Sequence, residues 1–298
     1  YVYEAMTDET GVADMKAPDT SMETNFHSMS ARKPGADDAP GLYTRDYTFP
    51  YRSGLGILQW FARRAYPMLR VAATLLATFA SAPTRYHTRA LRRALKYLQM
   101  HADDTLHFAR APDYDRINIE IHSFTDADWA ADRTSRRSLS GYLIYMNYNL
   151  ISIGCKYHPT QCLSTMEAEY MGEAFLAKEL SYIHHLLAEL GSRFAASLPI
   201  PIYGDNQAAL KYAEAHAVND RVKHIDIRHH WLHGLVSRGI ISMNFVGTKE
   251  NIADILTKPL NCLDTTKFRG FIVGKIQTPL RALIAGLTKL NALRHKKL

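Results

Sequence analysis

The spacing of apolar residues changes several times along the chain and predicts the order of its elements. Residues 117–124 alternate apolar and polar side chains, and residues 141–153 do so less cleanly, which predicts two strands. From Leu163 to Leu190 apolar residues recur at three- and four-residue steps or their sums, which predicts one long helix ended by Gly191. The later segments predict a strand at 199–203, a helix after 206, a helix at 226–237, a strand at 241–246 and a helical stretch at 251–257. Strands and helices in this order predict an α/β layer.

The segments on either side of this α/β region differ from it in pattern. Residues 1–48 are polar and acidic without a sustained period, which predicts an extended leader with no core of its own. Two helical patterns follow between Tyr51 and His101, with a break at 81–83, where a proline suits the first turn of a helix. The last segment is weakly patterned and ends in a basic tail. We therefore expect a leader (1–48), a helical basic connection (49–115), an α/β domain (116–262) and a tail (263–298).

Composition narrows the class of protein. The 298 residues are 47% hydrophobic and 22% charged, which excludes collagen, a coiled coil and a wholly disordered chain. The longest apolar run, 71–80, is half the roughly 20 residues that a membrane span needs, so we expect no membrane contact. The three cysteines lack a Cys-x-x-Cys spacing, which disfavours a disulfide framework or a cysteine zinc site. The chain opens without Met or a secretion signal, so we expect a piece of a longer intracellular protein, in a cytoplasmic particle or the nucleus.

Positive charge is concentrated in the helical connection. Nine basic side chains and no Asp or Glu lie between Thr48 and Ala102, while the net charge of the whole chain is +7. On a helix over 85–101, five of these cations fall within about 100° of arc, opposite an apolar face. They are Arg85, Arg89, Arg92, Arg93 and Lys96. A solvated face is the alternative, but the absence of interleaved acids favours a site for a polyanion such as nucleic acid.

Four carboxylates occupy positions where a structural role is hard to supply. Asp126 follows a strand directly, Glu169 lies in the long helix, Asp205 follows the strand at 199–203, and Asp254 lies in the first turn of the last helical stretch. Each alone has an ordinary explanation as a turn, a cap or a solvated side chain. Together, on strand ends and helix faces that can converge, they imply divalent cations, because clustered carboxylates otherwise repel. A pair of Mg²⁺ ions suits phosphodiester hydrolysis.

Six short motifs, in this order, resemble the ribonuclease H domain of copia-type LTR retrotransposon polyproteins. They are Thr-Asp-Ala-Asp-Trp-Ala (125–130), Arg-Arg-Ser-Leu-Ser-Gly-Tyr (136–142), Ser-Thr-Met-Glu-Ala-Glu-Tyr-Met (164–171), Asp-Asn-Gln-Ala-Ala (205–209), Lys-His-Ile-Asp-Ile-Arg (223–228) and Asn-Ile-Ala-Asp-Ile-Leu-Thr-Lys (251–258). Upstream, residues 51–56, 83–87 and 94–98 are similar to the segment that joins the reverse transcriptase to this domain. The resemblance covers roughly residues 10 to 275.

The resemblance implies a fold, an activity and a site. The fold is a ribonuclease-H-like mixed sheet flanked by helices and preceded by a small helical connection subdomain. The activity is cleavage of the RNA strand of RNA–DNA hybrids with two Mg²⁺ ions, for which Mn²⁺ can substitute, and the implied ligands are Asp126, Glu169, Asp205 and Asp254. No Tyr-x-Asp-Asp motif occurs, so the polymerase palm is missing here and is an expected partner in the parent polyprotein.

Other interpretations of the same residues stay open. Four histidines allow a zinc site, although no His-Glu-x-x-His motif accompanies them; they are His224, His229, His230 and His233. Asp128 lies two residues from Asp126 and competes with it as a ligand, Glu173 is expected to be a solvated neighbour of Glu169, and Trp129 and Trp231 are expected in the core. The main alternative function is a catalytically inert, nucleic-acid-binding remnant of a degraded retroelement.

Overall fold

The computed structural model describes most of the chain and divides it into two compact units. The described residues are 15–26, 41–104, 106–108, 119–191, 196–215, 226–273 and 277–295. The helical unit consists of Tyr1–Leu106, Asp132–Ser135 and Lys258–Val273. The sheet unit consists of His107–Ala131, Arg136–Thr257 and Gly274–Leu298. In the described parts, no helix is both long and apolar enough to cross a lipid bilayer.

Between Tyr51 and His101, the helical unit contains three α-helices where the sequence predicted two. They are α3 (Tyr51–Arg64), α4 (Arg70–Ala77) and α5 (Arg85–Met100), and a short 3₁₀ turn, η1 (Pro67–Leu69), separates the first two. The unpredicted break lies at Pro67, which has no backbone N–H and keeps Tyr66 out of the helical region, at φ −131° and ψ 81°. The break at 81–83 is confirmed, although α5 starts after Thr84, which caps it together with His87.

The leader contributes to the core of the helical unit, contrary to the expectation of an extended segment. Met22 and Phe26 are each 1% exposed. The ring of Phe26 stacks on Tyr86 at 5.8 Å and meets Phe79 edge-on at 6.0 Å. A few isolated apolar side chains, with no period to reveal them, are thus enough to anchor a polar segment.

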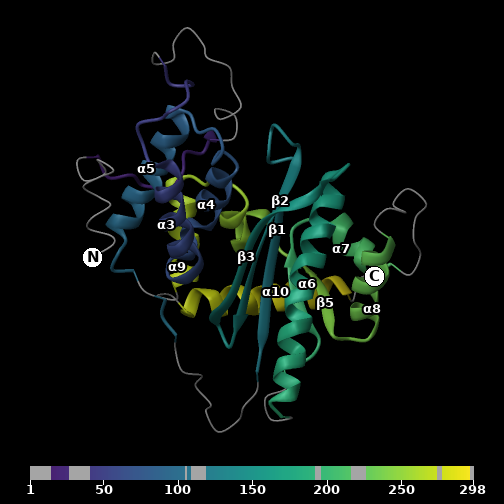
Figure 1. Ribbon diagram of the computed structural model, residues 1–298. Coiled ribbons are helices and arrows are strands. Elements are labelled where there is room, and N and C mark those ends of the chain that lie inside the picture. The colour runs from purple at the N-terminus through teal and green to yellow at the C-terminus, as the bar shows by residue number, and fades with distance from the viewer. Residues whose placement is uncertain are drawn as a thin grey trace. The chain divides into compact units, whose positions relative to one another are not determined.

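The sheet unit holds a mixed sheet, as predicted (Figure 1). It has five strands in the order β3-β2-β1-β4-β5, an order that the sequence did not predict. Strands β1 (Ile121–Asp128), β2 (Arg137–Met146) and β3 (Asn149–Gln161) are antiparallel neighbours. Strands β4 (Ile200–Gly204) and β5 (Ile241–Phe245) continue the sheet in parallel with β1. This mixed sheet agrees with the ribonuclease-H-like fold that the resemblance implies. Helix α6 (Thr165–Glu189) connects β3 to β4, and α7 (Gln207–Glu214) and α8 (Asp226–Ser237) lie between β4 and β5 in the chain.

The hairpin of β2 and β3 corrects the prediction of one strand at 141–153. The chain reverses at Asn147 and Tyr148, which have positive φ angles of 47° and 64°. Two consecutive positive φ angles are the backbone of a tight hairpin turn, which usually carries glycine at one of them. Without that glycine, the turn has little signal in the sequence.

The tail also differs from its prediction, because most of it is helical. Helix α9 (Cys262–Val273) belongs to the helical unit and α10 (Gln277–His295) to the sheet unit (Figure 1). Leu280, Ile284 and Leu287 of α10 are buried at helical spacing. The Asn291 amide accepts a hydrogen bond from Phe245 N at 2.9 Å and donates one to Phe245 O at 3.0 Å, which fixes α10 to β5.

The two faces of the sheet carry different elements. A Cβ on Gly172 of α6 would lie 2.9 Å from Ser140 Oγ, and a Cβ on Gly141 would lie 2.5 Å from Leu256 Cβ. Because consecutive residues of a strand point to opposite faces, α6 covers one face of β2, and η5 (Ile252–Leu256), a 3₁₀ helix, covers the other. A second short 3₁₀ turn, η4 (Thr248–Glu250), precedes η5. The stretch predicted as helical at 251–257 is therefore 3₁₀.

Candidate metal centre

Three of the four predicted carboxylates come together in the sheet unit. Asp126, Asp205 and Asp254 each offer one oxygen, and these oxygens lie within 4.8 Å of one another. Because β1 and β4 are parallel and pair Phe124 with Tyr203, Asp126 and Asp205 stand at the same level, two residues beyond that pair. Asp254 arrives from η5. The convergence of strand ends expected from the sequence is therefore present.

Short-range contacts hold η5 against the strands that carry the site. Asn251 donates from Nδ2 to the carbonyl oxygen of Thr125 at 2.9 Å, and its Oδ1 accepts from Ala253 N at 3.2 Å, which caps η5. The close approach of Leu256 to Gly141 requires a residue without Cβ. The Thr257 hydroxyl, directly after η5, donates to Asp126 Oδ2. A glycine on β2 thus allows a threonine to fix a carboxylate on β1.

Glu169 of α6 lies beside this cluster rather than within the set of three. It is 5% exposed, and burial, followed by the charges of Asp126, Asp205 and Glu173, raises its pKa to about 10. A backbone hydrogen bond from Ala127 opposes that rise. The Glu169 carboxyl is therefore protonated at neutral pH when no cation offsets its neighbours.

The donor set fits a divalent cation of the hard class. All four side chains offer carboxylate oxygens, which are the ligands that Mg²⁺ and Mn²⁺ favour. Asp126, Glu169 and Asp254 are 2%, 5% and 7% exposed, so their mutual repulsion is poorly screened by solvent. A cation among them would remove that cost. As ligands, the four residues are a prediction that is consistent with this geometry.

Glu167 and Glu173, which neighbour Glu169 on α6, are both buried. Glu167 Oε2 accepts from Leu163 N at 2.7 Å while Ser164 Oγ accepts from Glu167 N at 3.1 Å, so this pair caps α6. Glu173 is 1% exposed, and burial raises its pKa well above the usual value. The expectation that Glu173 is solvated is wrong, because residues 167–174 of α6 are all buried and the sequence does not show which face is inside.

Both tryptophans expected in the core lie at the surface and are partly exposed. Trp129 is 42% exposed and donates from Nε1 to the carbonyl oxygen of Cys162 at 2.9 Å. The Arg136 guanidinium lies 5.9 Å from the centre of its ring. Trp231 on α8 is 37% exposed. The residue type alone does not show whether a tryptophan is buried, and no repeating pattern of apolar residues includes these two.

The five cations of α5 are placed unequally. Arg85 and Arg89 are exposed, and Arg89 lies 3.8 Å from Glu23. The other three are half-buried: Arg92 lies over Phe49 at 4.8 Å, Arg93 donates to Thr20 O at 3.1 Å, and Lys96 donates to Gln99 Oε1 at 3.0 Å. The opposite face, with Leu91, Ala94, Leu95 and Leu98, is buried as predicted. Binding of nucleic acid by α5 stays a prediction.

The histidine alternative falls mostly outside the described residues. His224 lies outside them, and the structure does not describe the side chains of His229 and His230. Among the described residues, the group able to hold a metal is the aspartate cluster, and it contains no histidine. The zinc interpretation therefore stays untested.

Comparisons with known proteins relate the chain to retroelements. No family model matches. The chain is 33% identical over 221 residues to the "Retrovirus-related Pol polyprotein from transposon RE1" of Arabidopsis thaliana, which covers 74% of this chain and 14% of that protein. It is 37% identical over 134 residues to the "Secreted RxLR effector protein 161" of Plasmopara viticola, which covers 45% of this chain and 91% of that one.

A solved structure that resembles the chain is LC11-RNase H1 in complex with an RNA/DNA hybrid. It is 13% identical, with a TM-score of 0.35, and the match covers 46% of this chain and 94% of that one. The chain spans about one seventh of the length of the curated polyprotein it matches, since that share is 14%. On the sequence identity and the motifs together, the chain belongs to the family of retrovirus-related Pol polyproteins of copia-type transposons.

Proposed function

We propose that this chain cleaves the RNA strand of RNA–DNA hybrids in a reaction that depends on a divalent cation, as the ribonuclease H segment of a Pol polyprotein. The observation that carries the proposal is the convergence of Asp126, Asp205 and Asp254 within 4.8 Å from three separate elements. Carboxylates that are gathered this closely repel one another, which makes them costly to bury, and enzymes retain such clusters for chemistry.

Each residue of the site has a distinct task in this proposal. Asp126, Asp205 and Asp254 would hold the cations, with Glu169 as the fourth ligand. Cations held by these residues would supply a lowered pKa of the attacking water and would neutralise charge on the phosphate oxygens. Thr257 orients Asp126 through its hydroxyl hydrogen bond. Glu169 gives up its proton once positive charge offsets the neighbouring carboxylates, so its raised pKa keeps the cation-free site from repelling itself.

Preference for a hybrid would come from the RNA 2′-hydroxyl, which lets a protein distinguish RNA from DNA at a given place. The similarity to an RNase H1 in complex with an RNA/DNA hybrid agrees with this substrate. The polymerase region of the parent polyprotein is the proposed partner, because the chain matches only 14% of the Pol polyprotein from transposon RE1.

The test is incubation of the purified chain with an RNA–DNA hybrid labelled on the RNA strand. We expect cleavage with Mg²⁺ or Mn²⁺, loss of cleavage with EDTA, and no cleavage of double-stranded DNA. Equal cleavage of the DNA duplex, or full activity in EDTA, would contradict the proposal. Binding of the hybrid without any cleavage would instead favour an inert remnant.

A further inference from the structure

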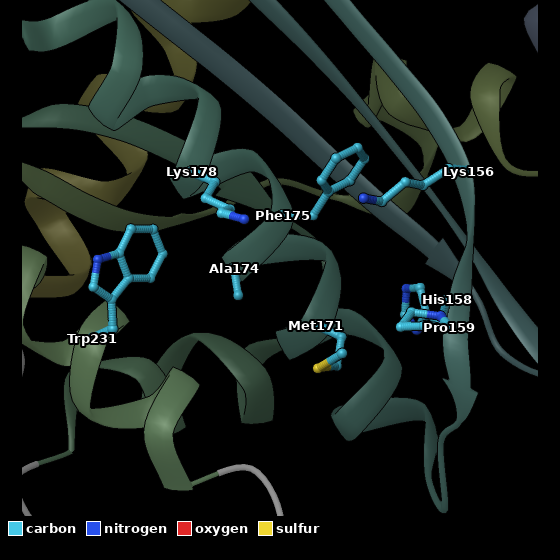
Figure 2. Close-up of a pocket in the computed structure, with 8 residues that line it drawn as sticks. All are labelled: Lys156, His158, Pro159, Met171, Ala174, Phe175, Lys178 and Trp231. Carbon is cyan, nitrogen blue, oxygen red and sulfur yellow. The ribbon is translucent and has the colours of Figure 1, made fainter.

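A groove on the outer side of α6 forms a second candidate site in the sheet unit. Its volume is about 390 Å³, and its lining includes Lys156 of β3, Met171, Phe175 and Lys178 of α6, and Trp231 of α8. Figure 2 shows α6 between the two walls, with Trp231 on one side and Lys156 and His158 on the other. Lys178 follows Glu169 by nine positions, about 180° around a helix with 3.6 residues per turn, so the groove faces away from the carboxylates.

The groove carries positive charge that the described residues do not balance. Its lining contains no Asp or Glu. Lys156 and Lys178 are exposed, and neither ammonium group forms an ion pair within the part of the chain that the structure describes. Lys156 Nζ lies 4.0 Å from the centre of the Phe175 ring, so the aromatic ring holds one cation at the groove. An anionic ligand would therefore meet two available charges.

Aromatic surface lies between these charges. Phe175 is fixed edge-on against Tyr142 at 4.9 Å, and Trp231 is 37% exposed. Rings that are fixed and accessible offer stacking surfaces for bases, and cations beside them meet phosphates. The volume lies in the range of roughly 300–1,000 Å³ that takes a small molecule, so the groove accepts a piece of one strand and not a duplex.

We propose that this groove binds single-stranded nucleic acid without sequence preference, with Lys156 and Lys178 on its phosphates and Trp231 and Phe175 against its bases. A hybrid with a single-stranded extension could place that extension in the groove, and these contacts would add to those of the hybrid at the carboxylate site. The proposal does not depend on cleavage, because none of the groups it uses belongs to the carboxylate site.

The test uses the full chain in EDTA and a fluorescent oligodeoxythymidylate of about 12 nucleotides, within the roughly 4–16 that one single-strand-binding domain covers. Affinity is measured by anisotropy at several salt concentrations. Lys156→Gln and Lys178→Gln should each lower the magnitude of the slope of log affinity against log salt by about 0.7. Lys289→Gln on α10 removes one exposed charge elsewhere and should leave the slope unchanged.

A second measurement separates the groove from the basic helix α5. In a chain with Trp60→Phe and Trp129→Phe, Trp231 is the one remaining tryptophan of three, and the oligonucleotide should quench its fluorescence. Trp231→Ala in the natural background should weaken binding roughly 5- to 150-fold. Unchanged salt slopes in both lysine variants, or unquenched Trp231, would overturn the proposal. Hybrid cleavage is assayed separately, so the loss of either activity leaves the other measurable.

Discussion

At the scale of single residues, Asp126 and Asp128 are alike in the sequence and differ in the structure. Both lie on β1 and point to the same face of the sheet. Asp126 is 2% exposed and belongs to the aspartate cluster, whereas Asp128 is the last residue of the strand and is not in that cluster. Spacing alone does not separate two such residues, because their difference arises from η5, which is remote in sequence.

Substitution of these two aspartates should therefore give opposite results. We expect Asp126→Asn to lose nearly all hybrid cleavage and Asp128→Asn, the matched control, to keep most of it.

Asp205→Asn should also reduce the rate by orders of magnitude without unfolding the protein, since removal of one carboxylate relieves repulsion among the others. Cleavage rates and circular dichroism measure both properties, and the reverse order of the Asp126 and Asp128 variants would overturn the assignment.

Glu169 should make the cation-free protein less stable as pH rises. Its pKa is raised from 4.5 to about 10 in the folded chain, so between these values the unfolded chain has lost a proton that the folded chain retains. Stabilisation from this group is fully present below pH 4.5 and is lost as pH rises toward 10. Urea unfolding in EDTA should show a steeper decline for the wild type than for Glu169→Gln. Equal pH dependence of the two proteins would mean that burial and the neighbouring charges do not raise the pKa of Glu169.

At the scale of elements, prediction succeeded where a pattern is local. Helix α6, strand β5 and helix α8 repeat their apolar residues within their own length, and all three lie where they were expected. The turn at Asn147 and Tyr148 was missed, because positive φ angles there are imposed by strand pairing and not by a glycine. Burial of Glu173 was missed for a related reason, since several elements pack around α6.

The packing of η5 on β2 gives a prediction at this scale. Gly141→Ala places a methyl group 2.5 Å from Leu256 Cβ and 3.2 Å from Thr257 Cγ2, so η5 must move away from the strand. We expect a loss of about 1–3 kcal/mol in the free energy of unfolding and a large loss of cleavage as Thr257 leaves Asp126.

The matched control for that substitution is Gly286→Ala in α10. No atom lies within 4 Å of the added methyl group, so helix propensity should instead stabilise the protein by about 0.5–1 kcal/mol. Denaturant unfolding and the hybrid assay compare the two variants. Full activity in Gly141→Ala would show that the site does not require close contact of η5 with β2.

The attachment of α10 to β5 gives another prediction for an element that was expected to be weakly patterned. Asn291 is 5% exposed and bonds both backbone groups of Phe245. Asn291→Ala should destabilise the sheet unit by about 1–3 kcal/mol, because it leaves buried polar groups without partners. Leu290→Ala, at a neighbouring position that is 40% exposed, should cost much less. Equal unfolding free energies for the two variants would mean that α10 is dispensable.

At the scale of the whole molecule, we propose that the basic helix α5 supplies affinity for the substrate of the carboxylate site. A site built of Asp and Glu repels phosphate until a cation binds, so affinity for a hybrid has to come from positive charge elsewhere. The structure narrows the candidates on α5, since Arg92, Arg93 and Lys96 are half-buried while Arg85 and Arg89 are exposed. Hybrid contact with α5 should therefore depend most on Arg85 and Arg89.

Each duplex phosphate neutralised contributes about 0.9 to the slope of log affinity against log salt. The double variant Arg85→Gln/Arg89→Gln should lower the magnitude of that slope for a hybrid by roughly 1.8. Because these residues touch no proposed metal ligand, the rate at saturating substrate should change little. Lys267→Gln/Lys289→Gln removes two exposed charges from α9 and α10 and should leave the slope as it was. If both double variants gave the wild-type slope, the basic face of α5 would serve solubility or a protein partner, and the helical unit would act as a spacer.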